Sequence, residues 1–175
     1  MQGSSLTDEK YNGEFPPFQT DWEQCLAPHQ NCLIAEQLDY DQVEMAEMAV
    51  TMKDQMNAEQ SATFEEITQH AGDGQTFWLQ GPGGTGKTFV YKALCAELCS
   101  QGKIVLCVAS SGIAALLLPG GHMAHSTFKI PIPVHDTSTC NTPKNGLWAA
   151  MLKGVTLTIW DEATAQHCHC IEAVD

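Results

Sequence analysis

The 175-residue sequence contains no arginine, and all eight of its basic residues are lysines. Lysine is a point charge, whereas arginine presents a planar fork that binds phosphate or guanine through two hydrogen bonds. The sequence therefore excludes bidentate arginine contacts to nucleic acid. It also excludes an arginine finger for phosphoryl transfer supplied by this chain.

Long apolar runs are also lacking. None exceeds the length of Ile113–Leu118, which ends at Pro119, whereas a membrane-spanning helix needs about 20 apolar residues. The first residues have neither a basic start nor an apolar stretch, so we expect no secretory signal. The eight cysteines are then expected to be cytosolic or nuclear thiols. With 43% hydrophobic and 17% charged residues, the chain can bury the core of one domain.

Acidic charge is concentrated in the first part of the chain. Residues 1–70 hold fourteen acids and two lysines, a net charge of −12, whereas residues 71–175 hold seven acids and six lysines. Only the second part could approach a polyanion without strong repulsion. We interpret the acidic part as a solvated surface or spacer.

Four potential metal ligands follow one another at His167-Cys168-His169-Cys170. They suggest zinc, but structural zinc sites usually combine two spaced ligand pairs, and no second pair matches this one. A structural or incidental role is the favoured interpretation.

The order of predicted elements indicates an α/β fold. We divide the chain into an irregular acidic leader (1–32), a helical extension (33–56) and an α/β domain (57–175). Within the domain, Asn57 should cap a helix, with Gln60 completing a capping box. Short apolar runs predict strands at Gln75–Gln80, Lys103–Ala109 and Val155–Trp160, and helices are expected at 87–100, 113–118 and 146–153. Buried strands alternating with helices predict a parallel sheet covered on both faces.

The strongest motif follows the first predicted strand and precedes a predicted helix. It reads Gly81-Pro82-Gly83-Gly84-Thr85-Gly86-Lys87-Thr88, which fits G-x-x-x-x-G-K-[ST] in the context expected of a P-loop. Glycines allow backbone N–H groups to surround phosphate oxygens, and the helix start favours negative charge. Lys87 is expected to contact the β- and γ-phosphates and Thr88 to bind Mg²⁺.

A second motif, Asp161-Glu162, comes directly after the last predicted strand. Parallel sheets bind ligands at the carboxyl ends of their strands. Asp161 therefore suits Mg²⁺ binding, as in a Walker B motif, and Glu162 suits polarisation of an attacking water. Gln60 has two candidate roles that are compatible, since its amide could cap its own helix or read adenine.

Five ordered segments resemble Pif-type (petite integration frequency) DNA helicases, especially those of Helitron-like transposons. They are Met56–Gln60, Gly81–Thr88, Val108–Ala115, Ala124–Phe128 and Ile159–Ala163. The resemblance implies a RecA-like, three-layer P-loop ATPase domain that uses ATP and Mg²⁺. The family hydrolyses ATP to move 5′ to 3′ along single-stranded DNA and unwind duplex, with nuclear roles in DNA repair, recombination and telomere maintenance.

Further residue roles follow from the resemblance. Gln60 matches the adenine-contacting glutamine of the family. The family's DNA contacts fall on Ser110, Ser111, Gly112, His125, Ser126, Thr127 and Phe128, although Phe128 could equally be a core residue. His122 stands where relatives usually have arginine. Because the net charge is −13, we expect weak DNA binding by this chain alone.

In the family, later motifs, a second RecA-like domain and arginine fingers follow Walker B. We therefore expect an N-terminal fragment with an incomplete sheet and little activity alone; the alternatives are an inactive nucleotide-binding remnant or a P-loop kinase. A later strand of the family separates the P-loop and Walker B strands. Gln75–Gln80 and Val155–Trp160 should thus flank a vacancy or collapse together, while Lys103–Ala109 pairs with Val155–Trp160.

Overall fold

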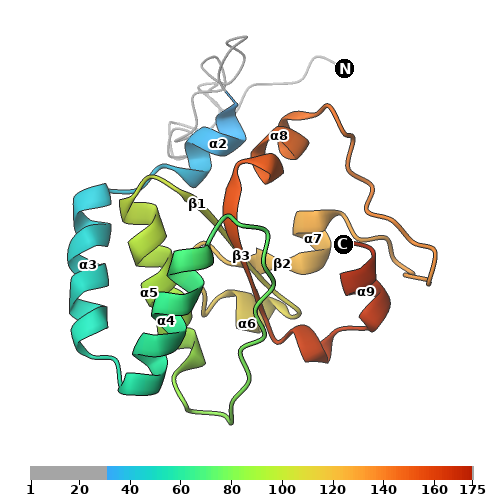
Figure 1. Ribbon diagram of the computed structural model, residues 1–175. Coiled ribbons are helices and arrows are strands. Elements are labelled where there is room, and N and C mark those ends of the chain that lie inside the picture. Colours follow the sequence, from blue (N-terminus) through green and yellow to red (C-terminus); the bar gives the residue numbers. More distant parts are fainter. Residues whose placement is uncertain (1–30, 175) are drawn as a thin grey trace, which may run out of the picture.

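The computed structural model describes residues 31–174, so the leader predicted for 1–32 lies almost entirely outside the described residues. Figure 1 shows helices packed around a small sheet. The helices are α2 (Cys32–Gln37), α3 (Gln42–Asp54), α4 (Ala58–His70), α5 (Lys87–Ser100), α6 (Gly112–Ala115), α7 (Ala124–Phe128), α8 (Leu147–Lys153) and α9 (Cys168–Glu172). The strands are β1 (Ile104–Ala109), β2 (His122–Met123) and β3 (Val155–Asp161), and a short 3-10 helix, η2, spans Ala163–Ala165. Among residues 31–174, no helix is long and apolar enough to cross a bilayer.

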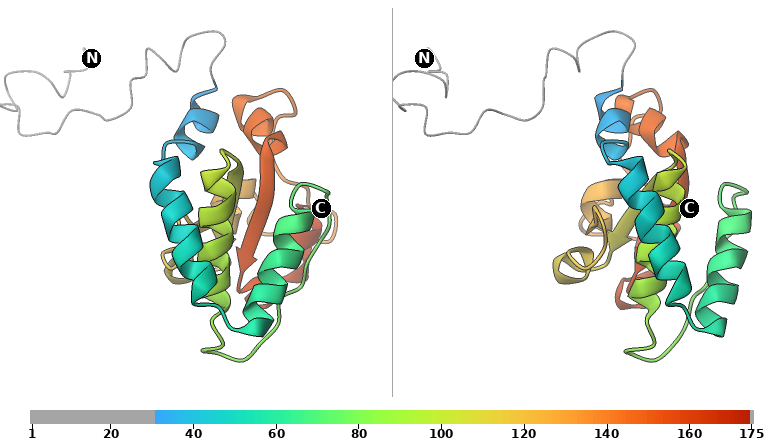
Figure 2. Two further views of the ribbon diagram at one scale, coloured as in Figure 1. Left: turned by 60° about the vertical axis from the view of Figure 1, so that its left-hand side comes forward. Right: turned by 90° about the vertical axis from the view of Figure 1, so that its left-hand side faces the viewer.

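The sheet is parallel and runs in the order β2-β1-β3. As predicted, β1 pairs with β3, and the register places Ala109 opposite Asp161. Alternate residues of β1 enter two separate cores, with Cys107 packing on the α4–α5 side and Val108 on the α7–α9 side. The two views in Figure 2 show the helices on either side of the strands. The predicted α/β fold with both sheet faces covered is confirmed.

Local signals explain where α4 begins. Asn57 accepts a hydrogen bond from the backbone N–H of Gln60 through its side chain (2.9 Å), and the Gln60 side chain accepts one from the Asn57 backbone N–H (3.1 Å). These two bonds satisfy donors that the first helical turn otherwise leaves free. The predicted capping box is therefore present, and Phe64 and Ile67 form the buried face of the helix.

The sequence predicted one helical segment from Leu33 to Met56, but the structure has two separate helices there. The segment is divided into α2 and α3, because the Asp41 carboxylate accepts hydrogen bonds from Val43 and Glu44 and starts a new helix. Lys53 anchors α3 by an ion pair with Glu97 of α5 (2.7 Å). The lysine hydrogen bond holds the pKa of the Glu97 carboxyl below its usual value, against a smaller opposing effect of burial.

The prediction of a strand at Gln75–Gln80 is wrong. This segment is extended but pairs with no strand of the described chain. An aromatic-rich extended segment becomes a strand only when a neighbouring edge lies within hydrogen-bonding distance. Within residues 31–174, β3 pairs only with β1. The segment and β3 instead line a shared cavity of about 1140 Å³, and Trp78 is 65% exposed. We expected this segment and β3 either to flank a vacancy or to collapse together, and the structure shows that they flank a vacancy.

The open edge of β3 predicts marginal stability. Unpaired strand edges template association with other chains, and apolar groups such as Trp78 are left in water. We expect a broad, low-temperature unfolding transition and self-association that grows with concentration, measured by circular dichroism and sedimentation velocity. A sharp, concentration-independent melt of a monomer would contradict this expectation.

Candidate nucleotide-binding site

The loop from Gly81 to Gly86 leads directly into α5, and two of its glycines have backbone angles that other residues rarely adopt. Gly84 has φ of 80° and Gly86 has φ of 86°. A Cβ on Gly86 would also collide with Nε2 of Gln60. The left-handed backbone thus requires glycine at position 86, and a Cβ there would also displace the end of the Gln60 side chain.

Lys87 is the first residue of α5, and its side chain folds back over the loop. Its Nζ donates hydrogen bonds to the carbonyl oxygens of Gly81 (2.7 Å) and Pro82 (3.0 Å). No side chain caps α5 at Gly86, which leaves its first N–H groups available to an anion. The loop thus combines a lysine and free backbone donors, the requirements for binding phosphate.

Gln60 connects α4 to this loop. Besides its capping role, its Nε2 donates a hydrogen bond to the carbonyl oxygen of Thr85 at 3.1 Å. The amide retains one hydrogen on Nε2 and a lone pair on Oε1. Its predicted contact with adenine remains a prediction, and its place beside the P-loop is compatible with that role.

Asp161 and Glu162 lie at the carboxyl end of β3, as predicted. Glu162 adopts a left-handed backbone with φ of 53°, which is unfavourable for a residue with a Cβ. Two hydrogen bonds fix it: its N–H donates to the Asp161 carboxylate (2.9 Å), and Ser110 Oγ donates to its carbonyl oxygen (2.7 Å). Ser110 also donates its backbone N–H to the Asp161 carbonyl. The end of β1 therefore holds the end of β3.

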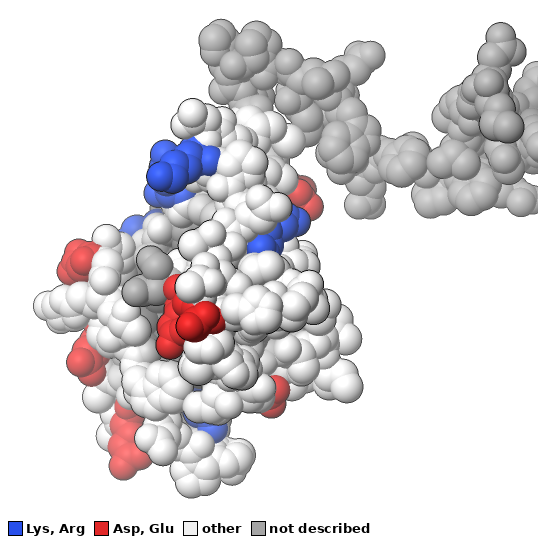
Figure 3. All heavy atoms as spheres, turned by 90° about the vertical axis from the view of Figure 1, so that its right-hand side faces the viewer, with Lys and Arg blue, Asp and Glu red and all other residues white. Residues whose placement is uncertain are grey.

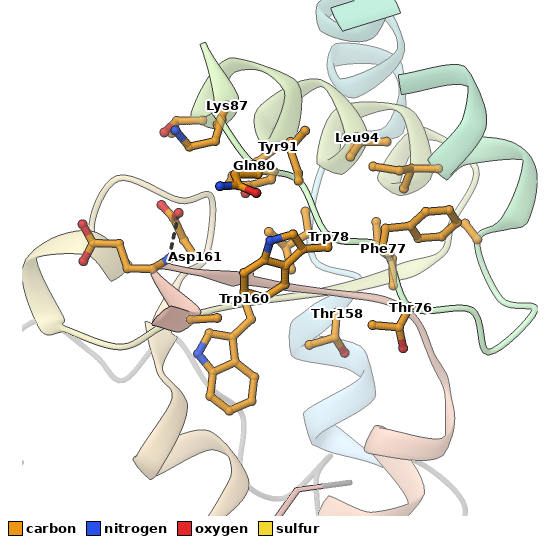
Figure 4. Close-up of a pocket in the computed structure, with 18 of the residues that line it drawn as sticks. Thr76, Phe77, Trp78, Gln80, Lys87, Tyr91, Leu94, Thr158, Trp160 and Asp161 are labelled. Carbon is orange, nitrogen blue, oxygen red and sulfur yellow. Dashed lines mark hydrogen bonds between the residues drawn. The ribbon is translucent and has the colours of Figure 1, made fainter. Parts of the chain in front are cut away.

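The loop and the strand-end acids line one cavity, the same one that separates Gln75–Gln80 from β3. Figure 4 shows Lys87 and Asp161 toward one end of it and Phe77 and Thr76 toward the other. Tyr91 of α5 also lines the cavity, and burial, followed by the nearby Asp161 carboxylate, raises the pKa of its phenol. Residues far apart in sequence thus line the same cavity.

The residues predicted to contact DNA have different environments. Ser111 caps α6 by accepting a hydrogen bond from Ala114, and Ser126 is exposed but donates to the Met123 carbonyl. Thr127 and Phe128 are 4% and 7% exposed, and the Phe128 ring stacks on Trp160. Of the two roles considered for Phe128, the structure therefore places it in the core.

Two further features bear on DNA binding. His125 is half-buried, and its Nδ1 lies 2.9 Å from Gln166 Nε2. Gly112 begins α6 beside exposed Ile113.

On the face shown in Figure 3, lysines are few and separated by uncharged surface, so this face offers no continuous basic track for a phosphate backbone.

Several contacts near the site had no sequence signal. The Ser110–Glu162 bond spans 52 residues and the Gln166–His125 contact spans 41, so neither could be inferred before the sheet register was known. Tyr91 also belongs to none of the motifs recognised in the sequence. Its helical position, one turn after Lys87, is the signal that could have placed it beside the loop.

A parallel sheet, a glycine-rich loop entering a helix and acids at a neighbouring strand end define this chain as a P-loop NTPase. A family model described as PIF1-like helicase matches residues 55–175, and the chain belongs to that family. It is also similar to the ATP-dependent DNA helicase PIF4 of Trypanosoma brucei brucei, with 30% identity over 111 residues. That match covers 59% of this chain but only 13% of the trypanosome protein.

The conformation of Gly86 can be tested with a matched pair of variants. Gly86→Ala should reduce the free energy of unfolding by about 1–2 kcal/mol from the left-handed backbone alone, with the Gln60 collision adding to it. Gly83→Ala should change it little, because a Cβ there has no atom within 4 Å. Urea unfolding of both variants provides the comparison. Equal effects at the two positions would contradict the assigned loop conformation.

Proposed function

We propose that this chain binds ATP with Mg²⁺ and forms part of the motor of an ATP-dependent DNA helicase. The observation that supports this most directly is the shared cavity, where the P-loop from Gly81 to Thr88 faces Asp161 and Glu162. In this proposal the loop amides and Lys87 bind the phosphates, Thr88 and Asp161 hold Mg²⁺, and Gln60 contacts adenine. Glu162 activates the attacking water as a general base.

The full cycle of ATP hydrolysis and DNA movement would belong to a whole helicase, and this sequence resembles one part of such an enzyme. There, ATP hydrolysis would drive 5′-to-3′ movement on single-stranded DNA and unwinding of duplex. The roles in DNA repair, recombination and telomere maintenance, the nuclear location and the Helitron affiliation are part of the same proposal. Because no arginine is present, an arginine finger would have to come from outside these residues, and its loss costs about 10³–10⁵ in rate.

Ser110 has a positioning role in this scheme. Its hydroxyl holds the Glu162 carbonyl, while the Asp161 carboxylate holds the Glu162 N–H. Together they maintain the left-handed backbone that aims the proposed base. Since Ser110 also begins the turn expected to contact DNA, a DNA phosphate competing for its hydroxyl would alter the position of Glu162. Ser110 thereby connects the two proposed sites.

Nucleotide binding can be tested by comparing substitutions of two lysines on helix α5. ATP–Mg²⁺ should raise the melting temperature, because a ligand that binds only the folded state stabilises it by about 2.7 kcal/mol at a hundred times its Kd. Lys87→Ala should remove most of this shift. Lys92→Ala, an exposed lysine on the same helix, should retain it. An undiminished shift in the Lys87 variant would contradict the phosphate-binding role.

The role of Ser110 can be tested by hydrogen exchange. Ser110→Ala should speed exchange of the backbone amides from 161 to 166 by roughly two- to tenfold, the effect of losing one hydrogen bond, and leave ATP–Mg²⁺ affinity unchanged. Ser111→Ala, which removes only the α6 cap, is the control. Unaltered exchange in the Ser110 variant would show that its hydroxyl does not hold Glu162.

A further inference from the structure

Three potential metal ligands gather at the start of α9, outside the proposed nucleotide site. They are His167, Cys168 and His169, and their ligand atoms all lie within 4.8 Å of one another. Cys168 Sγ lies 3.8 Å from Nδ1 of His167 and 3.8 Å from Nδ1 of His169. The thiol is thus placed between two imidazoles, and Cys168 and His167 are exposed to solvent.

These separations are close to those of a tetrahedral zinc site. Zinc binds sulfur at about 2.3 Å and imidazole nitrogen at about 2.0–2.1 Å, so sulfur and nitrogen ligands on one ion lie roughly 3.5 Å apart. The two sulfur–nitrogen separations of 3.8 Å therefore exceed this value by only a few tenths of an ångström, and the two imidazoles would close on the ion by rotating. Side chains on a solvent-exposed turn can make such movements at small cost.

Glu172 can provide a fourth ligand from the same helix after its exposed side chain rotates, because its carboxylate lies outside the cluster of the other three ligand atoms. Its Oε2 lies 2.7 Å from Nδ1 of His169, three residues earlier. A metal on His169 Nδ1 therefore has a carboxylate oxygen within reach. One thiolate and one carboxylate balance the charge of a divalent cation. Two existing contacts would be exchanged for metal bonds, namely His169–Glu172 and the weak bond from the His169 N–H to His167 Nδ1 (3.3 Å).

We propose that His167, Cys168, His169 and Glu172 form a zinc-binding site. Thiolate and imidazole ligands select zinc over Mg²⁺, which prefers oxygen, so this site would not compete for the ion at Asp161. Cys170, the next cysteine, does not take part. It is 2% exposed, and its Sγ faces His125 Nε2 at 3.7 Å.

The position of the site defines what zinc would do. The ligands begin five residues after Glu162, and they extend from the N-cap to the last residue of a helix only five residues long. Beneath it, Cys170 belongs to the core that contains Phe128 and, at its margin, Trp160. Zinc would hold α9 in its helical form on this core. The ion is structural here, and this inference does not depend on ATP binding.

Titration of the full chain with Co²⁺ tests the proposal, because Co²⁺ can replace zinc and, unlike zinc, has absorption bands that report its ligands. We expect one Co²⁺ per chain, with a thiolate-to-cobalt charge-transfer band that Zn²⁺ displaces. Cys168→Ser should abolish the band, and His169→Ala should weaken binding by more than about tenfold. The matched controls Cys32→Ser and His135→Ala, both outside the cluster, should bind as the unaltered chain does.

Zinc should also raise the melting temperature of the unaltered chain but not of Cys168→Ser. Absence of a thiolate band would overturn the proposal, as would a band that persists in Cys168→Ser. Equal loss of binding in the control variants would also overturn it, because it would indicate non-specific binding to scattered histidines and thiols. A failure here with intact ATP binding would leave the proposed function untouched.

Discussion

Parallel pairing between β1 and β3 is the interaction on which the rest of the structure depends. It places Ala109 opposite Asp161, so the two strands end together and their following residues meet. The bonds from Ser110 to Asp161 and Glu162 are direct consequences of that register. A shift of one residue would turn the strand-end acids to the other face of the sheet and separate them from the P-loop.

Features governed by local sequence could be predicted. The Asn57–Gln60 capping box, the helix after the P-loop, the buried strand β1 and the mostly half-buried strand β3 all occur where the sequence placed them. Each depends on contacts within a few residues or on a continuous apolar run, which single-sequence patterns report well. The P-loop was the clearest signal, because glycine spacing, the lysine and the flanking elements all agree.

Features that depend on distant partners could not be predicted fully. Gln75–Gln80 has strand-like composition but no edge to join, and the two-residue strand β2 is too short to leave a pattern. The break between α2 and α3 had a usable signal in Asp41, with Glu44 three residues later, but the methionine periodicity across it obscured the boundary. Burial of Phe128 against Trp160 follows from the packing of α7 on the sheet, which no local motif encodes.

In the proposed function, the P-loop and the end of β3 form one metal–nucleotide site. Electron paramagnetic resonance of Mn²⁺, bound with ATP in place of Mg²⁺, can test this arrangement. We expect Asp161→Asn to weaken Mn²⁺ binding in the presence of ATP while metal-free ATP still binds. Asp136→Asn, the same change at an exposed aspartate that is absent from the cavity lining, should leave the Mn²⁺ signal unchanged. Identical Mn²⁺ spectra and affinities in the unaltered chain and Asp161→Asn would contradict the claim.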